Sequence, residues 1–309
     1  MEKISVAVVG TGYLGKFHAQ KYCNMPGVEL VGVVDVDHKK ATSAARRYRT
    51  KAYKKYQEIL DKVDAVSIVV PTQFHYQVAK DFLQQGVDVL LEKPITTTLR
   101  QAEELIKIAQ KKDLIFQAGH LERFNAAVTA MRKLLTQPLF IESQRMSPFP
   151  ERGIDVDVVL DLMIHDIDII LSIVNSKIKR VEAVGAPILT NKVDIANAWI
   201  RFENGCVASI NASRVSQDKR RTLKIYQPDN YIFLDYHLPK LSVCRKYTKD
   251  GRGGDFSVRM EDIGLERNDP LEKELNSFID SVISRRAPLV SGIEGKRALE
   301  VALRILKKL

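Results

Sequence analysis

Residues 4–15 read Ile-Ser-Val-Ala-Val-Val-Gly-Thr-Gly-Tyr-Leu-Gly, an apolar run followed by three glycines in the spacing G-x-G-x-x-G. The apolar run predicts a strand at Ile4–Val9, and the residues after the glycines predict a helix at Leu14–Asn24. Between a strand and a helix, such glycines form a tight turn, let the backbone approach a pyrophosphate and bring the helix close to the strand. The start of the helix offers free N–H groups to the phosphates. The candidate dinucleotide-binding residues of this turn are Gly10, Gly12, Tyr13, Leu14 and Gly15.

An acidic residue follows at the spacing that this motif requires. Asp35 ends the next predicted strand, Leu30–Asp35, and stands 20 residues after Gly15. A carboxylate there can bind the adenosine ribose hydroxyls, so the combination favours dinucleotide binding over a purely structural glycine turn. Because a carboxylate repels a 2′-phosphate, Asp35 predicts NAD rather than NADP. His38, Lys39 and Lys40 follow directly and can weaken that preference.

The hydrophobic pattern divides the chain in two. As far as about Ala118, short apolar runs alternate with helical patterns, which predicts a doubly wound parallel sheet of the Rossmann type. From about Gly119 onward, strand-like segments follow one another with turns such as Asn204-Gly205, which predicts antiparallel neighbours in an α+β domain. We expect two domains, residues 1–120 and 121–309. The C-terminal helix at 293–309 can pack either within the second domain or back on the first domain.

The expected elements are as follows. Strands are predicted at Ile4–Val9, Leu30–Asp35, Ala65–Val70, Val87–Glu92, Leu114–Ala118, Phe140–Met146, Val181–Ile188, Asn197–Phe202, Val207–Ser213, Thr222–Tyr226, Tyr231–Tyr236 and Leu241–Tyr247. Helices are predicted at Leu14–Asn24, Lys39–Tyr48, His75–Gln85, Leu99–Lys111, Asn125–Leu135, Val156–Val174, Leu271–Ser284 and Glu294–Lys308. The polar stretch Lys249–Asp255 is predicted to be a loop.

A lysine stands at the carboxyl end of a predicted strand, in the sequence Glu92-Lys93-Pro94. Ligands of open α/β sheets bind at this end of the strands. Next to a cationic nicotinamide the ammonium form of Lys93 is disfavoured, so that Lys93 can donate to, or exchange a proton with, a substrate hydroxyl. The alternative is a surface lysine before a turn proline, and the motif alone does not separate the two.

The predicted helix Val156–Val174 carries an unusual polar stripe. Asp157, Asp161, His165 and Asp168 recur at intervals of four, four and three residues and therefore share a face. An ordinary solvent-facing stripe is rich in Lys and Glu, and residues 153–176 contain neither. The stripe therefore indicates a substrate cleft. His165 is the natural general base because its pKa lies near neutral pH, and Asp161, one turn earlier, can orient the substrate or the ring.

Two other interpretations of the stripe stay open. His165 can be a structural histidine among capping aspartates. Asp161, His165 and Asp168 can instead be metal ligands, but no further His or Cys cluster supports a metal site.

Composition limits the class of protein. With 45% apolar and 28% charged residues, the chain is typical of a folded globular protein, and no apolar run is long enough to span a bilayer. The three cysteines Cys23, Cys206 and Cys244 have no metal-binding spacing and indicate reduced thiols in a cytoplasmic protein. The formal charge of +10 fits either a solvated basic surface or attraction of an anionic substrate such as a nucleotide sugar. Basic residues occur in short clusters without a nucleic-acid motif, so no nucleic-acid or membrane partner is expected.

Five stretches together resemble the glucose–fructose oxidoreductase, inositol dehydrogenase and MocA family (Gfo/Idh/MocA) over nearly the whole chain. They are Gly10–Gly15 with His18, Pro71-Thr72-Gln73-Phe74-His75, Glu92-Lys93-Pro94, Gly119-His120-Leu121-Glu122-Arg123-Phe124-Asn125 and Asp161-Leu162-Met163-Ile164-His165-Asp166-Ile167-Asp168. The resemblance implies a Rossmann domain followed by an open antiparallel sheet that often builds a homodimer or homotetramer. One departure is Met163, which stands where the family often has glycine and narrows the space beside the stripe.

The resemblance also implies roles for particular residues. Lys93, Asp161 and His165 correspond to the family's catalytic lysine, aspartate and histidine. Pro71, Thr72, His75, Glu92 and Lys93 are expected beside the cofactor. Arg123 and Asn125, with Asp161 and His165, are expected at the substrate.

The resulting hypothesis is an NAD-dependent dehydrogenase that acts on a sugar hydroxyl. The stretches Gly119–Asn125 and Asp161–Asp168 are similar to members that oxidise the 3-hydroxyl of UDP-N-acetyl-hexosamines, a step toward the 3-amino sugars of lipopolysaccharide. The alternatives are an inositol or free-sugar dehydrogenase, a redox-neutral NAD-dependent glycosidase, and a non-catalytic NAD-sensing protein.

Overall fold

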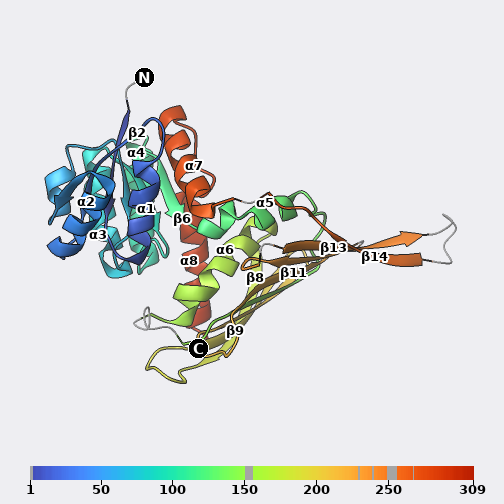
Figure 1. Ribbon diagram of the computed structural model, residues 1–309. Coiled ribbons are helices and arrows are strands. Elements are labelled where there is room, and N and C mark those ends of the chain that lie inside the picture. Colours follow the sequence, from blue (N-terminus) through green and yellow to red (C-terminus); the bar gives the residue numbers. More distant parts are fainter. Residues whose placement is uncertain (1–2, 150–155, 229, 239, 249–255, 267) are drawn as a thin grey trace. The chain divides into compact units, whose positions relative to one another are not determined.

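The computed structural model describes residues 3–149, 156–228, 230–238, 240–248, 256–266 and 268–309. The predicted loop Lys249–Asp255 lies outside the described residues. Contacts divide the chain into two compact units (Figure 1): the first unit comprises Met1–Leu121 and Leu271–Leu299, and the second comprises Glu122–Pro270 and Glu300–Leu309. Within the described ranges no helix combines the length and the apolar character needed to cross a membrane.

A six-stranded parallel sheet forms the centre of the first unit, in the order β3-β2-β1-β4-β5-β6. Its strands are β1 (Ile4–Val9), β2 (Val28–Val34), β3 (Lys51–Tyr53), β4 (Ala65–Ile68), β5 (Asp88–Glu92) and β6 (Phe116–Gly119). The helices are α1 (Tyr13–Cys23), α2 (His38–Tyr48), α3 (Thr72–Gln85), α4 (Leu99–Lys111) and α7 (Pro270–Ser284), with the start of α8 (Gly292–Leu306) and the short helix η1 (Tyr56–Ile59).

The strands of this sheet are apolar because helices cover both faces. Val8, Val66 and Val89 are fully buried, as the continuous apolar runs predict. The strand order reverses between β1 and β4, and open α/β sheets bind ligands at the carboxyl ends of such neighbouring strands. The loops after β1, β4 and β5 are therefore the expected place for a ligand in this unit.

The second unit contains an eight-stranded sheet in the order β14-β13-β12-β11-β7-β10-β9-β8. All neighbours are antiparallel except β7 and β10. The strands are β7 (Phe140–Met146), β8 (Ile178–Ala186), β9 (Ile195–Phe202), β10 (Val207–Ser213), β11 (Arg220–Tyr226), β12 (Asn230–Asp235), β13 (Lys240–Thr248) and β14 (Phe256–Asp262). The helical segments are η2 (Leu121–Phe124), α5 (Ala126–Arg132), η3 (Val159–Met163), α6 (Ile164–Ile173) and the end of α8.

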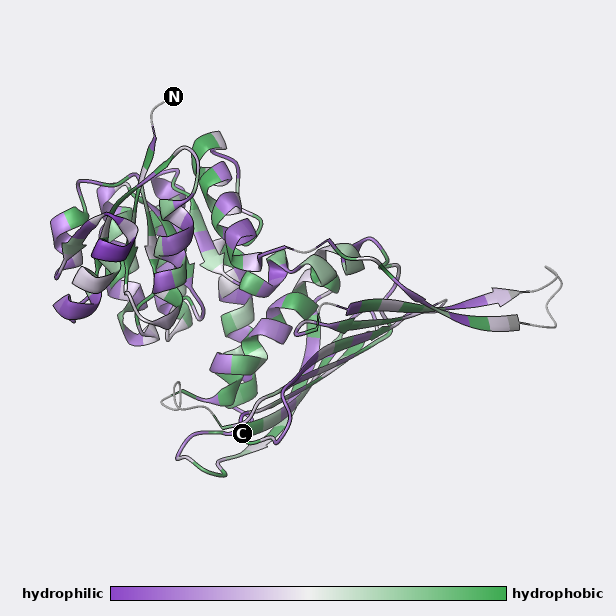
Figure 2. Ribbon diagram, viewed as in Figure 1, coloured by the Kyte–Doolittle hydropathy of each residue, from purple (hydrophilic) through white to green (hydrophobic). Residues whose placement is uncertain are grey.

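Among the described residues, helices cover one face of this sheet. Along β9, Ala196, Ala198 and Ile200 are fully buried, whereas Trp199 between them is 40% exposed. This alternation is typical of an antiparallel sheet with one solvated face. Both α5 and α6 lie on the covered face (Figure 1), and Figure 2 shows that α6 is largely hydrophobic, as burial on the sheet requires.

The predicted fold class, a Rossmann-type parallel sheet plus an α+β unit with an open, mostly antiparallel sheet, is confirmed. Two strands were not expected. The strand β3 has only three residues, which is too short for a periodic signal, and β14 follows the polar stretch that obscures its start. The start of α8 packs on β6, because an added Cβ at Gly295 would lie 2.7 Å from Ala118.

Candidate active site

The glycine turn after β1 has the backbone geometry that its sequence predicts. Gly10 has φ = 97°, and a Cβ there would lie 2.5 Å from the carbonyl oxygen of Val69. At Gly15 a Cβ would collide with the carbonyl oxygen of Gly10, so the start of α1 can approach β1 only through glycine. Gly12 is the N-cap of α1 and makes no side-chain cap, which leaves the first N–H groups of the helix available to an anion.

Asp35 is tied to this turn by two hydrogen bonds. The backbone N–H of Thr11 and its hydroxyl donate to Asp35 Oδ2 at 2.9 and 2.8 Å. The other oxygen, Oδ1, accepts from the backbone N–H of Asp37 at 2.9 Å. The carboxylate therefore joins the end of β2 to the glycine turn, and the buried Thr11 is the partner that sequence reasoning missed, because it occupies a variable position of the motif.

The residues that follow Gly12 are accessible. Tyr13 is 64% exposed and makes an edge-to-face contact with Phe17, with ring centroids 5.4 Å apart. Leu14 is partly buried against the core of the unit. Their predicted contact with a cofactor stays a prediction.

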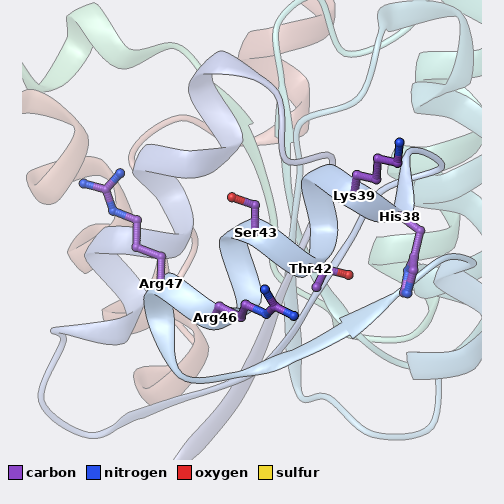
Figure 3. Close-up of a pocket in the computed structure, with 6 residues that line it drawn as sticks. All are labelled: His38, Lys39, Thr42, Ser43, Arg46 and Arg47. Atoms are coloured by element: carbon purple, nitrogen blue, oxygen red, sulfur yellow. The ribbon is translucent and has the colours of Figure 1, made fainter.

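A cavity of about 640 Å³ lies along α2, directly after the strand that ends near Asp35. It is lined by His38, Lys39, Thr42, Ser43, Arg46 and Arg47 (Figure 3). Figure 3 shows His38 and Lys39 at the start of the helix and the two arginines pointing in different directions at its end. The helix thus gathers two of the short basic clusters of the sequence on its exposed side, and Figure 2 shows it as strongly hydrophilic.

His75 connects two loops at the carboxyl ends of β4 and β5. Its buried ring lies with Nδ1 2.8 Å from the carbonyl oxygen of Pro94 and Nε2 2.7 Å from that of Val70. Burial lowers the pKa of His75 although both carbonyls oppose the shift, so the ring is neutral at pH 7 and donates to one of them. Pro71 is the N-cap of α3 and Thr72 its first residue. The structure thus gives His75 a tethering role, and its contact with a cofactor stays a prediction.

Lys93 follows β5 in this tethered loop and is half-buried. Its backbone N–H donates to Glu92 Oε2 at 3.2 Å, and the Lys93–Pro94 peptide bond is cis. Glu92 is 7% exposed, and its Oε1 lies 3.5 Å from Nε2 of the buried His18. Lys93 is therefore held at the ligand-binding end of the sheet by Glu92 on one side and by the His75 contact with Pro94 on the other.

The predicted α-helix Val156–Val174 is wrong in its first half. Residues Val159–Met163 form a π-helical turn, and the α-helix α6 begins only at Ile164. The intervals of four, four and three residues place side chains on one face only if the period is α-helical throughout, and this period does not apply across a π-turn. Asp161 lies within the π-turn and His165 at the start of α6, and both side chains are half-buried. Such turns occur frequently at functional sites.

The other two aspartates of the predicted stripe serve the structure of the second unit. Asp157 accepts a hydrogen bond from the backbone N–H of Val193 at 2.9 Å. Asp168 is 3% exposed and pairs with Arg123, whose Nε lies 3.4 Å from Asp168 Oδ2. The four residues therefore do not form one accessible stripe.

Asp166, next to His165, anchors α6 to the sheet. Arg145 of β7 donates to both oxygens of Asp166 at 2.8 and 3.2 Å and to Glu122 at 3.1 Å, and its guanidinium lies 5.2 Å from the ring centre of Tyr236. Arg145 is 2% exposed, so a bidentate buried ion pair fixes the rotation of the helix that carries His165.

A second arginine extends this network toward Asp161. Arg221 of β11 is the cross-strand neighbour of Arg145, and its guanidinium lies 4.0 Å from Glu122. Burial and the neighbouring Arg145 guanidinium lower the pKa of Arg221, and the carboxylates Glu122, Asp166 and Asp161 offset this only in part. Sequence reasoning missed Arg145 and Arg221, because lone arginines within strands carry no motif.

The predicted substrate residues Arg123 and Asn125 are both buried. Asn125 is the N-cap of α5: its Oδ1 accepts from the backbone N–H of Ala127 at 2.9 Å. Arg123 is 6% exposed and forms the pair with Asp168. Their contact with a substrate stays a prediction, and the structure gives each a role in stability.

The metal interpretation finds no support in the described part of the chain. There, no group of three or more His, Cys, Asp or Glu side chains is arranged to hold a metal ion. Asp168, one of the three ligands considered, instead faces a guanidinium.

Comparison with known proteins agrees with this architecture. Residues 4–120 match the family model described as the oxidoreductase family with an NAD-binding Rossmann fold, and residues 136–229 match the Gfo/Idh/MocA C-terminal domain. The chain is 36% identical over 309 residues to a UDP-N-acetylglucosamine 3-dehydrogenase of Acidithiobacillus ferrooxidans, covering 99% of this chain and 97% of that protein. A crystal structure of that enzyme superposes with a TM-score of 0.93, covering 100% of this chain and 98% of that one.

A more distant relative is the myo-inositol 2-dehydrogenase of Thermotoga maritima, 27% identical over 95% of this chain and 92% of that protein. The matches to both family models and the full-length similarity leave one assignment. The chain belongs to the Gfo/Idh/MocA family of oxidoreductases, and its first unit is an NAD-binding Rossmann domain.

Proposed function

We propose that this protein is an NAD-dependent dehydrogenase that oxidises the 3-hydroxyl of a UDP-N-acetyl-hexosamine, with UDP-N-acetylglucosamine as the first substrate to test. One observation carries the choice of substrate: the similarity to the UDP-N-acetylglucosamine 3-dehydrogenase extends over 99% of this chain at 36% identity. The inositol dehydrogenase is also related over most of its length, at 27% identity, and makes a free polyol the second candidate.

The residues of the first unit fit NAD. The uncapped start of α1 offers N–H groups to the pyrophosphate, and the position that a Cβ would take at Gly12 faces open space. Asp35, at the end of β2, is the acid expected to bind the adenosine ribose. Tyr13, Leu14, Pro71 and Thr72 border the same loops and complete the proposed site.

The proposed chemistry assigns one task to each residue. When bound, NAD would supply the hydride acceptor of the reaction. His165 takes the proton of the sugar hydroxyl as the carbon loses that hydride, so the alcohol becomes a ketone. Lys93 stabilises the negative charge that develops on the oxygen, an interaction that strengthens in the transition state. Asp161 holds the sugar or the imidazole in orientation, and Arg123 and Asn125 support the sugar-binding side.

Replacing Lys93 with Ala tests this assignment. A positioned acid or base contributes about 10²- to 10⁴-fold to a rate, so we expect kcat of the variant to fall by at least about 10²-fold. NAD binding, measured by titration, should change little because the glycine turn and Asp35 are untouched. Lys107→Ala, an exposed lysine of α4 in the same unit, is the control. A Lys93→Ala enzyme with the wild-type rate contradicts the proposed role.

A panel of substrates separates the alternatives. Absorbance of NADH is followed with UDP-N-acetylglucosamine, free N-acetylglucosamine, myo-inositol and glucose. Net NADH formation with the nucleotide sugar supports the proposal, and formation only with inositol favours the polyol dehydrogenase. Release of sugar without net NADH indicates a redox-neutral glycosidase. Binding of NAD without turnover of any substrate favours a sensing protein.

We further propose a cytoplasmic homo-oligomer. The three cysteines are free thiols, which suits a reducing compartment. The solvated face of the second sheet carries Trp199 and the ring cluster of Phe140, Tyr226 and Tyr231. Light scattering combined with size-exclusion chromatography gives the subunit number, and a monomer at micromolar concentration contradicts this part of the proposal.

A further inference from the structure

A row of polar side chains crosses the core of the first unit. Ser67 of β4 and Gln117 of β6 are both register partners of Leu90 on the central strand β5. Glu92 lies two residues beyond Leu90 on the same face of the sheet, so the polar side chains on this face are Ser67, Glu92 and Gln117. The helices that cover this face add three more polar groups. These are His18 and Tyr22 of α1, and Glu274 of α7 (Figure 1), whose backbone carbonyl accepts from Gln117 Nε2 at 3.3 Å.

Glu274 is the most unusual member of this row. It is fully buried, on the helix that contributes Leu271, Leu275 and Phe278 to the core of the unit, and neither carboxyl oxygen has a hydrogen-bond partner in the described part of the chain. Burial and the neighbouring Glu92 carboxylate raise the pKa of Glu274 well above its ordinary range. An unpaired ionised carboxylate in such a place is far more costly than a protonated one, so Glu274 is neutral.

Glu92 is the natural acceptor for a hydrogen bond donated by the protonated carboxyl group of Glu274. Its Oε2 accepts from the backbone N–H of Lys93, and its Oε1 has no hydrogen bond in the described residues, although His18 lies 3.5 Å away. Glycine at position 119 leaves room for this carboxyl group, since an added Cβ would lie 2.9 Å from it. Of the two acids, Glu92 is the one with nearby donor groups, the backbone N–H of Lys93 and the ring of His18.

We propose that Glu274 is a positioning residue for Lys93. Its neutral carboxyl group supplies, directly or through one internal water molecule, the hydrogen-bond donor that Glu92 Oε1 lacks. Glu92 is thereby fixed, and with it the backbone of Lys93 at the ligand-binding end of the sheet. The role in turnover rests on the proposed function of Lys93, whereas the neutral state of Glu274 is independent of it.

The pH dependence of stability tests the neutral state without any assay of activity. Among the described residues, the titratable groups beside Glu274 and Glu92 are His18 and Tyr22 of α1, while β4 and β6 contribute the uncharged Ser67 and Gln117. A carboxyl with a raised folded-state pKa contributes stability below its unfolded pKa, and that contribution is lost as the pH rises toward the folded pKa. Glu274→Gln removes this loss.

We therefore measure the melting temperature of wild type and Glu274→Gln from pH 5 to pH 8.5. The variant should gain on the wild type as the pH rises, by about 3 °C or more across the range. Glu272→Gln, an exposed acid on the same helix that pairs with Lys21, is the matched control and should show no such trend. A difference between Glu274→Gln and wild type that does not depend on pH overturns the neutral assignment.

Kinetics test the positioning role. Gln at 274 still donates a hydrogen bond, so Glu274→Gln should keep kcat within about twofold of wild type. Leu at 274 has a similar volume but no donor, and Glu274→Leu should lose about tenfold in kcat with little change in KM for NAD, a loss of 1.4 kcal/mol. Equal activity of the Gln and Leu variants overturns the role. If Glu274→Leu does not fold, a tenfold loss of kcat in Glu274→Gln overturns it instead. If the wild-type protein is inactive on every substrate, the proposed function is contradicted, whereas the neutral state assigned to Glu274 is not.

Discussion

At the scale of single residues, Asp35 shows how one carboxylate serves two purposes. Sequence spacing identified it as the acid at the end of β2, and the structure adds its two hydrogen bonds to Thr11. An incoming ribose must therefore share a carboxylate that already fixes the glycine turn. The negative charge of Asp35 opposes a 2′-phosphate, whereas His38 and Lys39 line the adjacent cavity along α2.

Asp35→Ser should shift the cofactor preference toward NADP. Loss of the carboxylate removes the ribose contact and the repulsion together, and the cations of the cavity then attract the 2′-phosphate. We expect kcat/KM with NAD to fall about tenfold, one charge-assisted hydrogen bond being worth about 1.5–3 kcal/mol, and kcat/KM with NADP to rise. The Asp37→Ser variant keeps an N-cap on α2 and is the control. An unchanged ratio of the two kcat/KM values contradicts the role of Asp35.

Sequence reasoning at this scale found residues with motifs and missed residues without them. Gly10, Gly15 and Asp35 lie where the spacing predicts. His75 and Asn125 were predicted at ligands, and the structure shows them making backbone contacts that hold loops and helix starts. The buried Glu274 has no motif either, and its environment arises from strands and helices that are distant in sequence.

At the scale of elements, the regular segments were predicted well because their patterns are local. Ile4–Val9, Leu99–Lys111, Phe140–Met146 and Val207–Ser213 have the bounds that their hydrophobic patterns predict. The π-turn at Val159–Met163 was not predictable in this way. A π-turn changes the period of the helix without any signal in the composition, so the spacing from Asp157 to His165 cannot be read with an α-helical period. Asp168 is three residues after His165 within α6, and it is buried because it pairs with Arg123.

The ion pair between Arg145 and Asp166 should be essential for docking α6 on the sheet. Asp166→Asn leaves a buried guanidinium with only Glu122 as an anionic partner, and breaking such a pair costs about 3–5 kcal/mol. Urea unfolding should show this loss of unfolding free energy. The pair between Arg180 and Glu182 is 70% and 53% exposed, so Glu182→Gln should cost at most about 1 kcal/mol. Equal effects of the two substitutions contradict the proposed anchor.

The segment of residues 37–55, which contains α2 and β3, carries most of the excess positive charge. Residues 37–55 contain eight Lys and Arg and one Asp, a net +7 of the chain's +10, and all eight basic side chains are exposed. Such a surface attracts anionic ligands over roughly 10 Å at 0.1 M salt.

Reversing the charge of Arg46 and Arg47 should therefore weaken capture of the anionic cofactor. For the double variant Arg46→Glu/Arg47→Glu we expect KM for NAD to rise about threefold at 20 mM salt and to approach the wild-type value at 0.5 M, where the screening length is only about 4 Å. Lys307→Glu/Lys308→Glu makes the same charge change in the second unit and is the control. A threefold effect that persists at 0.5 M salt contradicts steering.

At the scale of the whole molecule, the first unit is not a continuous stretch of chain. Its core includes Leu271, Leu275 and Phe278 of α7, which pack with Tyr22 and Leu90. The sequence predicts a division between residues 120 and 121. The assignment of cofactor binding to residues 1–120 and of substrate binding to residues 121–309 stays a prediction. Hydrophobic periodicity identified α7 as a helix but carries no information about which core it joins.

Phe278→Ala should consequently destabilise the nucleotide-binding unit. Truncating a fully buried phenylalanine costs about 3–5 kcal/mol. We expect NAD binding to be lost at a temperature several degrees lower than in wild type, as measured by calorimetry with and without NAD. Ile283 is 63% exposed on the same helix, and Ile283→Ala should leave the transition unchanged. A Phe278→Ala protein that keeps wild-type thermal behaviour contradicts the packing of α7 in this core.

The late position of α7 also affects how the protein is made. The ribosome has synthesised all six parallel strands by residue 119. The side chains of α7 that complete their core are synthesised only after residue 270. The nascent nucleotide-binding unit therefore stays incompletely folded, with part of its apolar surface exposed, while the whole second sheet is translated. Chaperone association should accordingly last until translation is almost complete.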